Sequence, residues 1–148
     1  MNSILRNILA IVAGLLIGNI VNMTIIMFSS YLVLPPPGVD TSTMEGLKEG
    51  MHLFEPKHYL MPFLAHALGT FTGAYVVALL AANNKMIFAL VIGCFFFIGS
   101  ILTIFILPSP TWFTILDLVV AYFPMAWLGG ILAGAAFKKN QSLFRMGF

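Results

Sequence analysis

Residues 112–137 read WFTILDLVVAYFPMAWLGGILAGAAF. The stretch is almost wholly apolar, and it contains Asp117, the one carboxylate that lies inside any apolar run of the sequence. At 1.5 Å per residue, roughly 20 helical residues cross about 30 Å of hydrocarbon, so this stretch is long enough to span a bilayer. A charge in hydrocarbon costs roughly 2.5 to 3.5 kcal/mol. We therefore expect Asp117 to face protein or water, and we treat it as the first candidate for a functional site.

The composition places the rest of the chain in a lipid bilayer as well. Of the 148 residues, 60% are hydrophobic and only 8% are charged, which is too few charges to cover a water-soluble surface. Three further apolar runs span about residues 8–33, 60–82 and 86–107. They lack the strict alternation of a membrane β-barrel, which favours helices. Because the links are short, we predict an all-α integral membrane protein in which residues 1–148 form a single four-transmembrane-helix bundle.

The first connection, residues 34–59, is the longest link between the predicted spans. It starts with three consecutive prolines and a glycine, which end the first helix. Met44, Leu47, Met51 and Phe54 then recur at spacings of three, four and three residues, which places them on one side of a short helix. We predict a short amphipathic helix that lies on the membrane surface or caps the bundle.

Basic residues are unevenly distributed over the short flanks of the four spans. They precede the first span, lie in the second connection and follow the last span: Arg6, Lys85, Lys138, Lys139 and Arg145. The first connection is net acidic, with two lysines and four carboxylates, and the third has no charge. By the positive-inside rule, we expect both termini in the cytoplasm and residues 34–59 outside, as in a multi-pass protein of a bacterial inner (plasma) membrane.

Small residues recur every fourth position in three of the spans. The pairs are Gly14 and Gly18, Gly69 and Gly73, and Gly130 and Gly134. At this spacing the two glycines share a helix face and let two backbones approach closely. The pair in the last span lies on a different side from Asp117. We therefore expect it to contact a second copy of the chain or another membrane subunit.

Polar residues of all four spans fall at a similar depth from the outer end. They are Asp117, His66, Thr103, Asn22 and Ser100. Thr70 is a further candidate, because it lies on the same helix side as His66. Counted at about 1.5 Å per residue, the first three lie roughly 10 Å inside and the next two somewhat deeper. If these helix sides converge, they form one buried polar cluster. Asp117 and His66 are its natural hydrogen-bonded or ionic pair.

Two interpretations of this cluster remain open. It is either an interhelical hydrogen-bond clamp, worth about 1 to 2 kcal/mol at best, or an outward-opening pocket or proton-linked site. In the second interpretation Asp117 binds a cation or a proton, and His66 is its partner.

Two functions correspond to these interpretations. The first is a non-enzymatic helix-bundle component that self-associates in the lipid bilayer or serves as an accessory subunit of a larger membrane complex. The alternative is a small oligomeric transporter or channel with an outward-facing polar site around Asp117 and His66, whose small-molecule ligand the sequence does not identify.

Other functions have no support in the residue pattern. His52, His58 and His66 are spaced by six and eight residues, which does not repeat a helix face and so does not predict a metal site. A second histidine at the depth of His66, which a bis-histidine haem needs, is missing from the sequence. P-loop, dinucleotide and G-x-S-x-G motifs are also missing, so we expect no cofactor and no enzyme activity. Cys94 is the single cysteine, and no basic patch predicts nucleic acid binding.

Overall fold

The computed structural model describes residues 2–145, with side chains as far as residue 134. All regular elements in this part of the chain are helical. In chain order they are α1 (Ser3–Leu32), α2 (Met44–Gly50), the short 3-10 helices η1 (Met51–Leu53) and η2 (Pro56–Tyr59), α3 (Leu60–Leu80), α4 (Lys85–Ile106), α5 (Thr111–Val120) and α6 (Phe123–Arg145). Four segments are long and apolar enough to cross a membrane: Ser3–Leu32, Pro56–Leu80, Lys85–Ile106 and Thr111–Gly134. The prediction of an all-helical chain with four such segments is confirmed.

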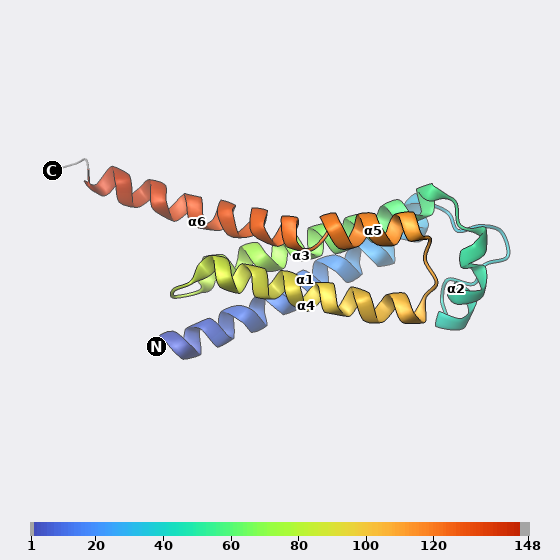
Figure 1. The fold of residues 1–148 in the computed structure, drawn as a ribbon, viewed down its shortest axis with the longest axis horizontal. Helices are drawn as coiled ribbons and strands as arrows, with labels where there is room; N and C mark the ends of the chain where they lie inside the picture. The colour runs from blue at the N-terminus through green and yellow to red at the C-terminus, as the bar shows by residue number, and fades with distance from the viewer. Residues whose placement is uncertain (1, 146–148) are drawn as a thin grey trace.

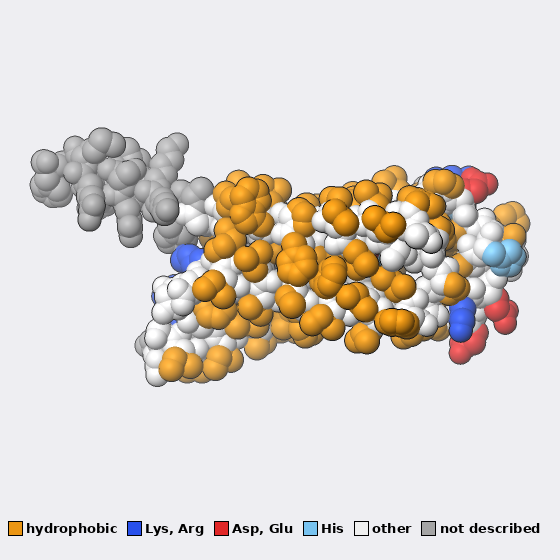
Figure 2. Space-filling view, in the orientation of Figure 1, with side chains coloured by type: hydrophobic (Ala, Val, Ile, Leu, Met, Phe, Trp, Pro, Cys, Tyr) orange, Lys and Arg blue, Asp and Glu red, His pale blue; other side chains and the backbone are white. Residues whose placement is uncertain are grey.

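The four long segments run along the molecule, and successive ones point in opposite directions (Figure 1). The N-terminus and the turn between α3 and α4 lie at one end, here called the terminal end; α2 lies at the opposite end, here called the cap end. Hydrophobic side chains cover the visible middle of the bundle, whereas charged side chains gather at its two ends (Figure 2). This distribution and the four apolar segments suggest a multi-pass membrane protein.

Glycines bring the backbones of α1 and α3 into close contact. A Cβ placed on Gly14 would lie 2.7 Å from the carbonyl oxygen of Gly73, and one placed on Gly18 would lie 2.8 Å from that of Gly69. Real Cβ atoms essentially never come closer than 3.0 Å to another heavy atom in this way. Any side chain at these positions would therefore push the two helices apart, as in other close helix pairs of membrane proteins.

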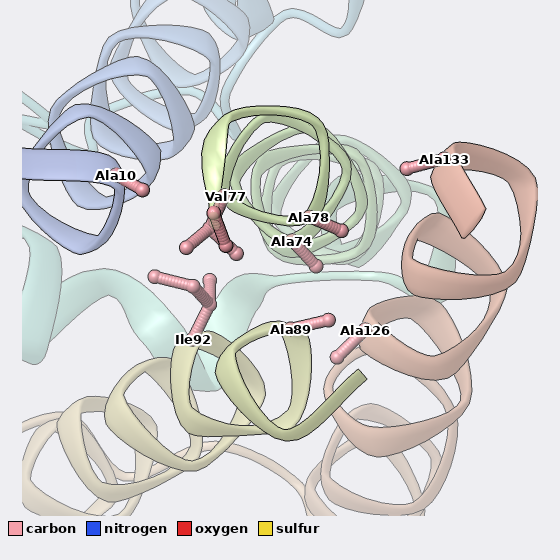
Figure 3. Packing of buried hydrophobic residues seen from close by; sticks show 9 residues of the cluster. Ala10, Ala74, Val77, Ala78, Ala89, Ile92, Ala126 and Ala133 are labelled. Carbon is pink, nitrogen blue, oxygen red and sulfur yellow. The ribbon is translucent and has the colours of Figure 1, made fainter. Parts of the chain in front are cut away.

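Small apolar side chains fill the terminal half of the bundle. Eight residues of this cluster, from α1, α3, α4 and α6, are labelled in Figure 3, and each is at most 1% exposed: Ala10, Ala74, Val77, Ala78, Ala89, Ile92, Ala126 and Ala133. Gly130 belongs to the same contact, because a Cβ placed on it would lie 2.9 Å from the Cβ of Ala89. Within the part of the chain whose side chains are described, nothing lies within 4 Å of a Cβ placed on Gly134. The small side chains let α6 pack closely on α3 and α4.

The fourth apolar run, predicted as one span over residues 112–137, forms two helices. Ala121 and Tyr122 separate α5 from α6. Pro124 has no N–H to donate to the carbonyl oxygen of Val120, so the hydrogen-bond ladder of the helix is interrupted at this point. The interruption lets the side chain of Tyr122 reach back to Asp117.

The first helix begins at Ser3, earlier than the predicted start near residue 8. The side chain of Asn2 caps it, since its Oδ1 accepts a hydrogen bond from the N–H of Ile4 at 3.1 Å. Nε of Arg6 donates to the carbonyl oxygen of Leu80 at 2.8 Å, which ties the start of α1 to the end of α3. Of the residues used to predict orientation, Lys138, Lys139 and Arg145 have side chains outside the described residues.

The predicted amphipathic helix of the first connection is present as α2, which η1 continues. Thr43 caps α2, because its hydroxyl oxygen accepts a hydrogen bond from the N–H of Gly46 at 3.1 Å. Just before it, the hydroxyl and the N–H of Ser42 both donate to Asp40, at 2.6 and 2.8 Å. These bonds lower the pKa of the exposed Asp40 carboxyl from its ordinary value. They also order the turn that leads into α2 and so fix the direction of its apolar side.

Candidate functional site

Asp117 accepts hydrogen bonds from three other parts of the bundle. Its Oδ2 lies 2.9 Å from Nδ1 of His66 on α3. The hydroxyl of Tyr122 donates to the same oxygen at 2.8 Å, and the hydroxyl of Ser100 on α4 donates to it at 3.4 Å. Asp117 is only 3% exposed. Hydrogen-bond donors from three parts of the bundle therefore surround the buried carboxylate.

The imidazole of His66 links this buried carboxylate to a cavity. Nδ1 lies within 3.0 Å of both carboxylate oxygens, so its N–H is the donor. In a neutral ring with the proton on Nδ1, Nε2 carries a lone pair. No described residue bonds to Nε2, and the side chain of His66 is 27% exposed and lines the cavity. Asp117 thus sets the tautomer and orientation of a ring whose second nitrogen is available to a ligand.

The cavity has a volume of about 510 Å³ and extends from this pair toward the cap end. Asp117, His66, Ser100 and Tyr122 form a polar cluster in its lining, which also includes the polar residues Asn19, Asn22, His58, Tyr59, Thr103, Ser109 and Thr114. Most of the remaining lining is hydrophobic and comes from α1, α3, α4 and α5. Small-molecule sites in proteins typically enclose about 300 to 1,000 Å³, with mainly apolar walls and a few polar groups. The cavity matches that description in both size and lining.

The apolar side of α2 and η1 covers the cavity. Met44, Leu47, Met51 and Phe54, which the sequence places on one side of a helix, all line it. Leu47, Met51 and Phe54 are half-buried there, whereas Met44 is 52% exposed. These contacts supply packing that a helix of only seven residues needs, because its own backbone hydrogen bonds are too few. The first connection therefore closes the cap end of the cavity.

His58 attaches this connection to the end of α1. Its Nδ1 accepts a hydrogen bond from the N–H of Glu55 at 2.8 Å, so the neutral ring carries its proton on Nε2. Nε2 then donates to the carbonyl oxygen of Leu34 at 3.1 Å. Beside it, Lys57 lies 2.8 Å from the Glu55 carboxylate and lowers the pKa of that exposed group by hydrogen bonding and charge. Backbone groups occupy both ring nitrogens of His58, in contrast to His66.

The other predicted site residues are divided between the cavity and the core. Asn22 lines the cavity, is half-buried and makes no hydrogen bond to another described residue. Thr103 also lines it, but its hydroxyl donates to the carbonyl oxygen of Gly99 at 3.0 Å. Thr70 is fully buried away from the lining, and its hydroxyl has no partner within the described part of the chain. Asn22 is therefore available to a ligand, whereas Thr70 is not.

Two tyrosines that sequence reasoning missed contribute to the cavity. Tyr122 is 1% exposed, and its ring centre lies 5.9 Å from that of His66. Tyr59 is 4% exposed, and its hydroxyl has no partner among residues 2–134. Tyr122 follows Asp117 by five residues, a spacing that points away from it in an unbroken helix. Pro124 was the signal for the break that brings the two residues together.

The side chains that meet at Asp117 supply one carboxylate, one imidazole and two hydroxyls. Together they can exchange a proton or bind a hydrogen-bonding group. Among residues 2–134, no group of three His, Cys, Asp or Glu side chains is placed to hold a metal ion. Cys94 is exposed on α4 and is not part of the cavity lining.

No protein-family model, curated protein or solved structure matches this chain. Its function is therefore inferred from the cavity and from the side chains that line it. Asp117, His66 and Asn22 are the residues on which the inference depends.

Proposed function

We propose that this chain is a multi-pass membrane protein that binds a small molecule in the cavity through Asp117 and His66. The observation that carries the proposal is the imidazole of His66, which a buried carboxylate holds by Nδ1 while Nε2 has no partner among the described residues. Such a ring can accept a hydrogen bond or a proton from a ligand. The carboxylate of Asp117 then stabilises the positive charge that results.

A structural clamp accounts for less of this geometry. A clamp needs only the bonds to Asp117, and single interhelical hydrogen bonds in membrane proteins contribute about 0.6 kcal/mol on average. It gives no reason for a cavity of about 510 Å³ beside the pair. Empty space next to a clamp forfeits packing contacts, which makes the helix contact weaker. Ligand binding accounts for both the pair and the cavity.

The distribution of charge supports a cap end that faces outside. Arg6 and Lys85 lie at the terminal end, whereas the net acidic connection of residues 34–59 lies at the cap end. By the positive-inside rule, this distribution supports our proposal that both termini are cytoplasmic and that the cavity lies in the outer half of a bacterial inner membrane. A membrane-impermeant maleimide should then label Thr41→Cys, in a Cys94→Ala background, on intact spheroplasts. Labelling only after permeabilisation would reverse the orientation.

The cavity ends at the closely packed terminal half of the bundle. Ala89 and Ala126 are fully buried there, and a Cβ placed on Gly93 would lie 2.7 Å from the Cβ of Ala126. In this conformation the described helices therefore close the cavity at the terminal end, as expected for a binding protein or for one state of a transporter. Transport would require α6 to separate from α4 at these residues.

Self-association has less support than ligand binding. The small residues of the last span that prompted it are partly used inside the bundle. A Cβ placed on Gly130 would lie 2.9 Å from the Cβ of Ala89, and one placed on Gly129 would lie 2.6 Å from the carbonyl oxygen of Phe71. An oligomeric or accessory role is compatible with one binding site in each copy of the chain.

Native mass spectrometry of the protein in lipid nanodiscs tests ligand binding. The probes are dodecylamine, dodecanol and dodecanoate, which share one alkyl chain and differ in charge. We expect the wild type to retain at least one of them in excess over Gly99→Trp. Gly99 lines the cavity, and nothing lies within 4 Å of a Cβ placed there, so a large side chain can fill the cavity without meeting the backbone.

Gly134→Trp is the matched control for that experiment. No described atom lies within 4 Å of a Cβ placed on Gly134, and this residue is not part of the cavity lining. It should retain the probes as the wild type does. Equal retention of all three probes by the wild type and by Gly99→Trp would contradict ligand binding in the cavity.

A further inference from the structure

The cavity is open on one side at the level of the apolar helices. Met23 on α1 and Phe95 on α4 both line it, and they are 57% and 55% exposed. A side chain that lines a cavity and is also exposed belongs to its rim. Both residues lie within segments that are apolar enough to cross a membrane. This part of the rim therefore faces hydrocarbon rather than water.

The opening exists because α1 and α4 separate toward the cap end. Closer to the terminal end they touch: a Cβ placed on Gly14 would lie 3.3 Å from Ile92, and one placed on Gly18 would lie 3.0 Å from the ring of Phe96. One turn beyond Phe96, nothing lies within 4 Å of a Cβ placed on Gly99. With α2 and η1 over the cap end, a ligand reaches the cavity most directly from the lipid between α1 and α4. Such a ligand must be lipophilic.

The charged and titratable residues of the lining favour a cation. The lining contains one carboxylate, Asp117, and two histidines, His58 and His66, but no lysine or arginine. With both imidazoles neutral, the lining carries one negative charge, which attracts a cation strongly in surroundings of low dielectric constant. Phe95 and Phe96 also line the cavity, and aromatic rings attract cations. An anion would find no positive partner among the lining residues.

Two of the hydrogen-bond acceptors in the lining, one on α3 and one on α1, have no partner among the described residues. They are Nε2 of His66 and the amide oxygen of Asn22. A Cβ placed on Gly69 would lie 3.0 Å from the Cβ of Asn22, and Gly69 follows His66 by about one helical turn. A primary ammonium group carries three N–H donors, enough to bind both acceptors.

We propose that the cavity takes up a lipophilic primary ammonium ion from the outer leaflet through the gap between α1 and α4. Its N–H groups donate to Nε2 of His66 and to the amide oxygen of Asn22, and Asp117 supplies the counter-charge. Its alkyl chain lies in the gap beside Met23 and Phe95. This inference rests on the proposed function, ligand binding in the cavity, and names the class of ligand.

Primary ammonium groups occur on free long-chain amines and on the headgroup of phosphatidylethanolamine. The headgroup also carries a phosphate, which proteins bind with arginine, lysine or helix N-termini. Because the lining has no lysine or arginine, the phosphate would enter the cavity without a charged partner. The lining therefore favours the free amine.

Equilibrium binding to phosphatidylcholine nanodiscs tests this assignment. Dodecylamine is compared with dodecyltrimethylammonium, which has the charge but no N–H, with dodecanol, which has a donor but no charge, and with added phosphatidylethanolamine. The measured quantity is the amount of each probe that the wild type retains in excess over Gly99→Trp. This difference removes the contribution of probe that partitions into the lipid. We expect dodecylamine to bind at least about tenfold more tightly than the other three.

Two variants test where the ammonium group lies. Asp117→Asn should weaken dodecylamine binding about tenfold or more, because it removes the counter-charge. Asn22→Leu should weaken dodecylamine binding severalfold, and it leaves the hydrogen bonds to Asp117 in place. This variant therefore tests the site even if Asp117→Asn fails to fold. Circular dichroism of each variant shows whether it is folded. Gly134→Trp should bind dodecylamine as the wild type does.

The possible failures are distinguishable. If dodecanol or dodecyltrimethylammonium is retained better than dodecylamine, the ammonium assignment is overturned and ligand binding in the cavity stands. If phosphatidylethanolamine is retained best, a lipid headgroup and not a free amine is the ligand. If Asp117→Asn and Asn22→Leu both bind dodecylamine as the wild type does, the ammonium site is elsewhere. If no probe is retained in excess over Gly99→Trp, the proposed function fails as well.

Discussion

The hydroxyl of Tyr122 donates to Oδ2 of Asp117 at 2.8 Å across the break between α5 and α6. The same oxygen lies 2.9 Å from Nδ1 of His66. A residue five positions further along an unbroken helix would point away from Asp117. The break in the last span therefore adds a donor to the carboxylate at the polar end of the cavity.

Removing this hydroxyl should destabilise the bundle. Tyr122→Phe keeps the ring but deletes one donor to a buried carboxylate, so we expect the free energy of unfolding to fall by about 1 to 2 kcal/mol. Unfolding by SDS titration, followed by circular dichroism, measures the change. The control is Tyr75→Phe, because Tyr75 stacks on Phe71 and makes no side-chain hydrogen bond within the described residues. Equal losses in the two variants would contradict the role of the Tyr122 hydroxyl.

The effects of His66→Ala and Asp117→Asn on stability should not be additive. In a double-mutant cycle we expect a coupling energy of about 1 to 2 kcal/mol, since His66→Ala removes the 2.9 Å interaction and Asp117→Asn removes the charge that strengthens it. His58→Ala provides the control cycle with Asp117→Asn, because His58 bonds to Leu34 and Glu55 instead. That second cycle should be additive within about 0.5 kcal/mol. A coupling energy near zero in the first cycle would show that the two side chains do not interact in the membrane.

The same added methyl group should have opposite effects at two glycines. A Cβ placed on Gly73 would lie 2.7 Å from the carbonyl oxygen of Gly14, so Gly73→Ala must separate α1 from α3. We expect it to cost about 1 to 3 kcal/mol of stability. At Gly99 the added Cβ has nothing within 4 Å. Gly99→Ala should therefore raise the free energy of unfolding by about 0.5 to 1 kcal/mol, because alanine has the higher helix propensity. Thermal unfolding measures both variants. A Gly73→Ala variant more stable than Gly99→Ala would refute the close α1–α3 contact.

Thr70→Val should be tolerated. The hydroxyl of Thr70 is buried without a partner in the described part of the chain, so its removal relieves an unsatisfied polar group. We expect stability to rise or to change by less than about 0.5 kcal/mol. Retention of dodecylamine should also be unchanged, because Thr70 does not line the cavity. A loss of stability well above that limit would mean that the hydroxyl has a partner in the membrane.

The helix side on which each residue lies, and its depth along its span, were sufficient to place His66 near Asp117. Both quantities come directly from the sequence, because regular helices have a fixed rise and rotation per residue. The apolar side of residues 44–54 was likewise readable from its period. The part of the site that depends on local rotation and rise was therefore predictable.

Other parts of the site depend on features that the residue periodicity within one helix does not encode. Tyr122 reaches Asp117 only because the helix is interrupted before Pro124, and the rotation across such a break is set by packing. The gap between α1 and α4 depends on the tilt of α1, which its contacts with Gly69 and Gly73 determine. The covering position of α2 depends on tertiary contacts of the same kind. Interactions between helices, rather than patterns within one helix, create the cavity.

The central claim is that Asp117 holds His66 by Nδ1 and leaves Nε2 available to the cavity. Nitrogen NMR of labelled histidine in lipid bilayers, at a pH where the imidazole is neutral, measures the tautomer directly. We predict that Nδ1 of His66 carries the proton, that Nε2 does not, and that added dodecylamine shifts the Nε2 resonance in the wild type but not in Gly99→Trp. A proton on Nε2, or resonances of His66 that are the same in the wild type and in Asp117→Asn, would contradict the account.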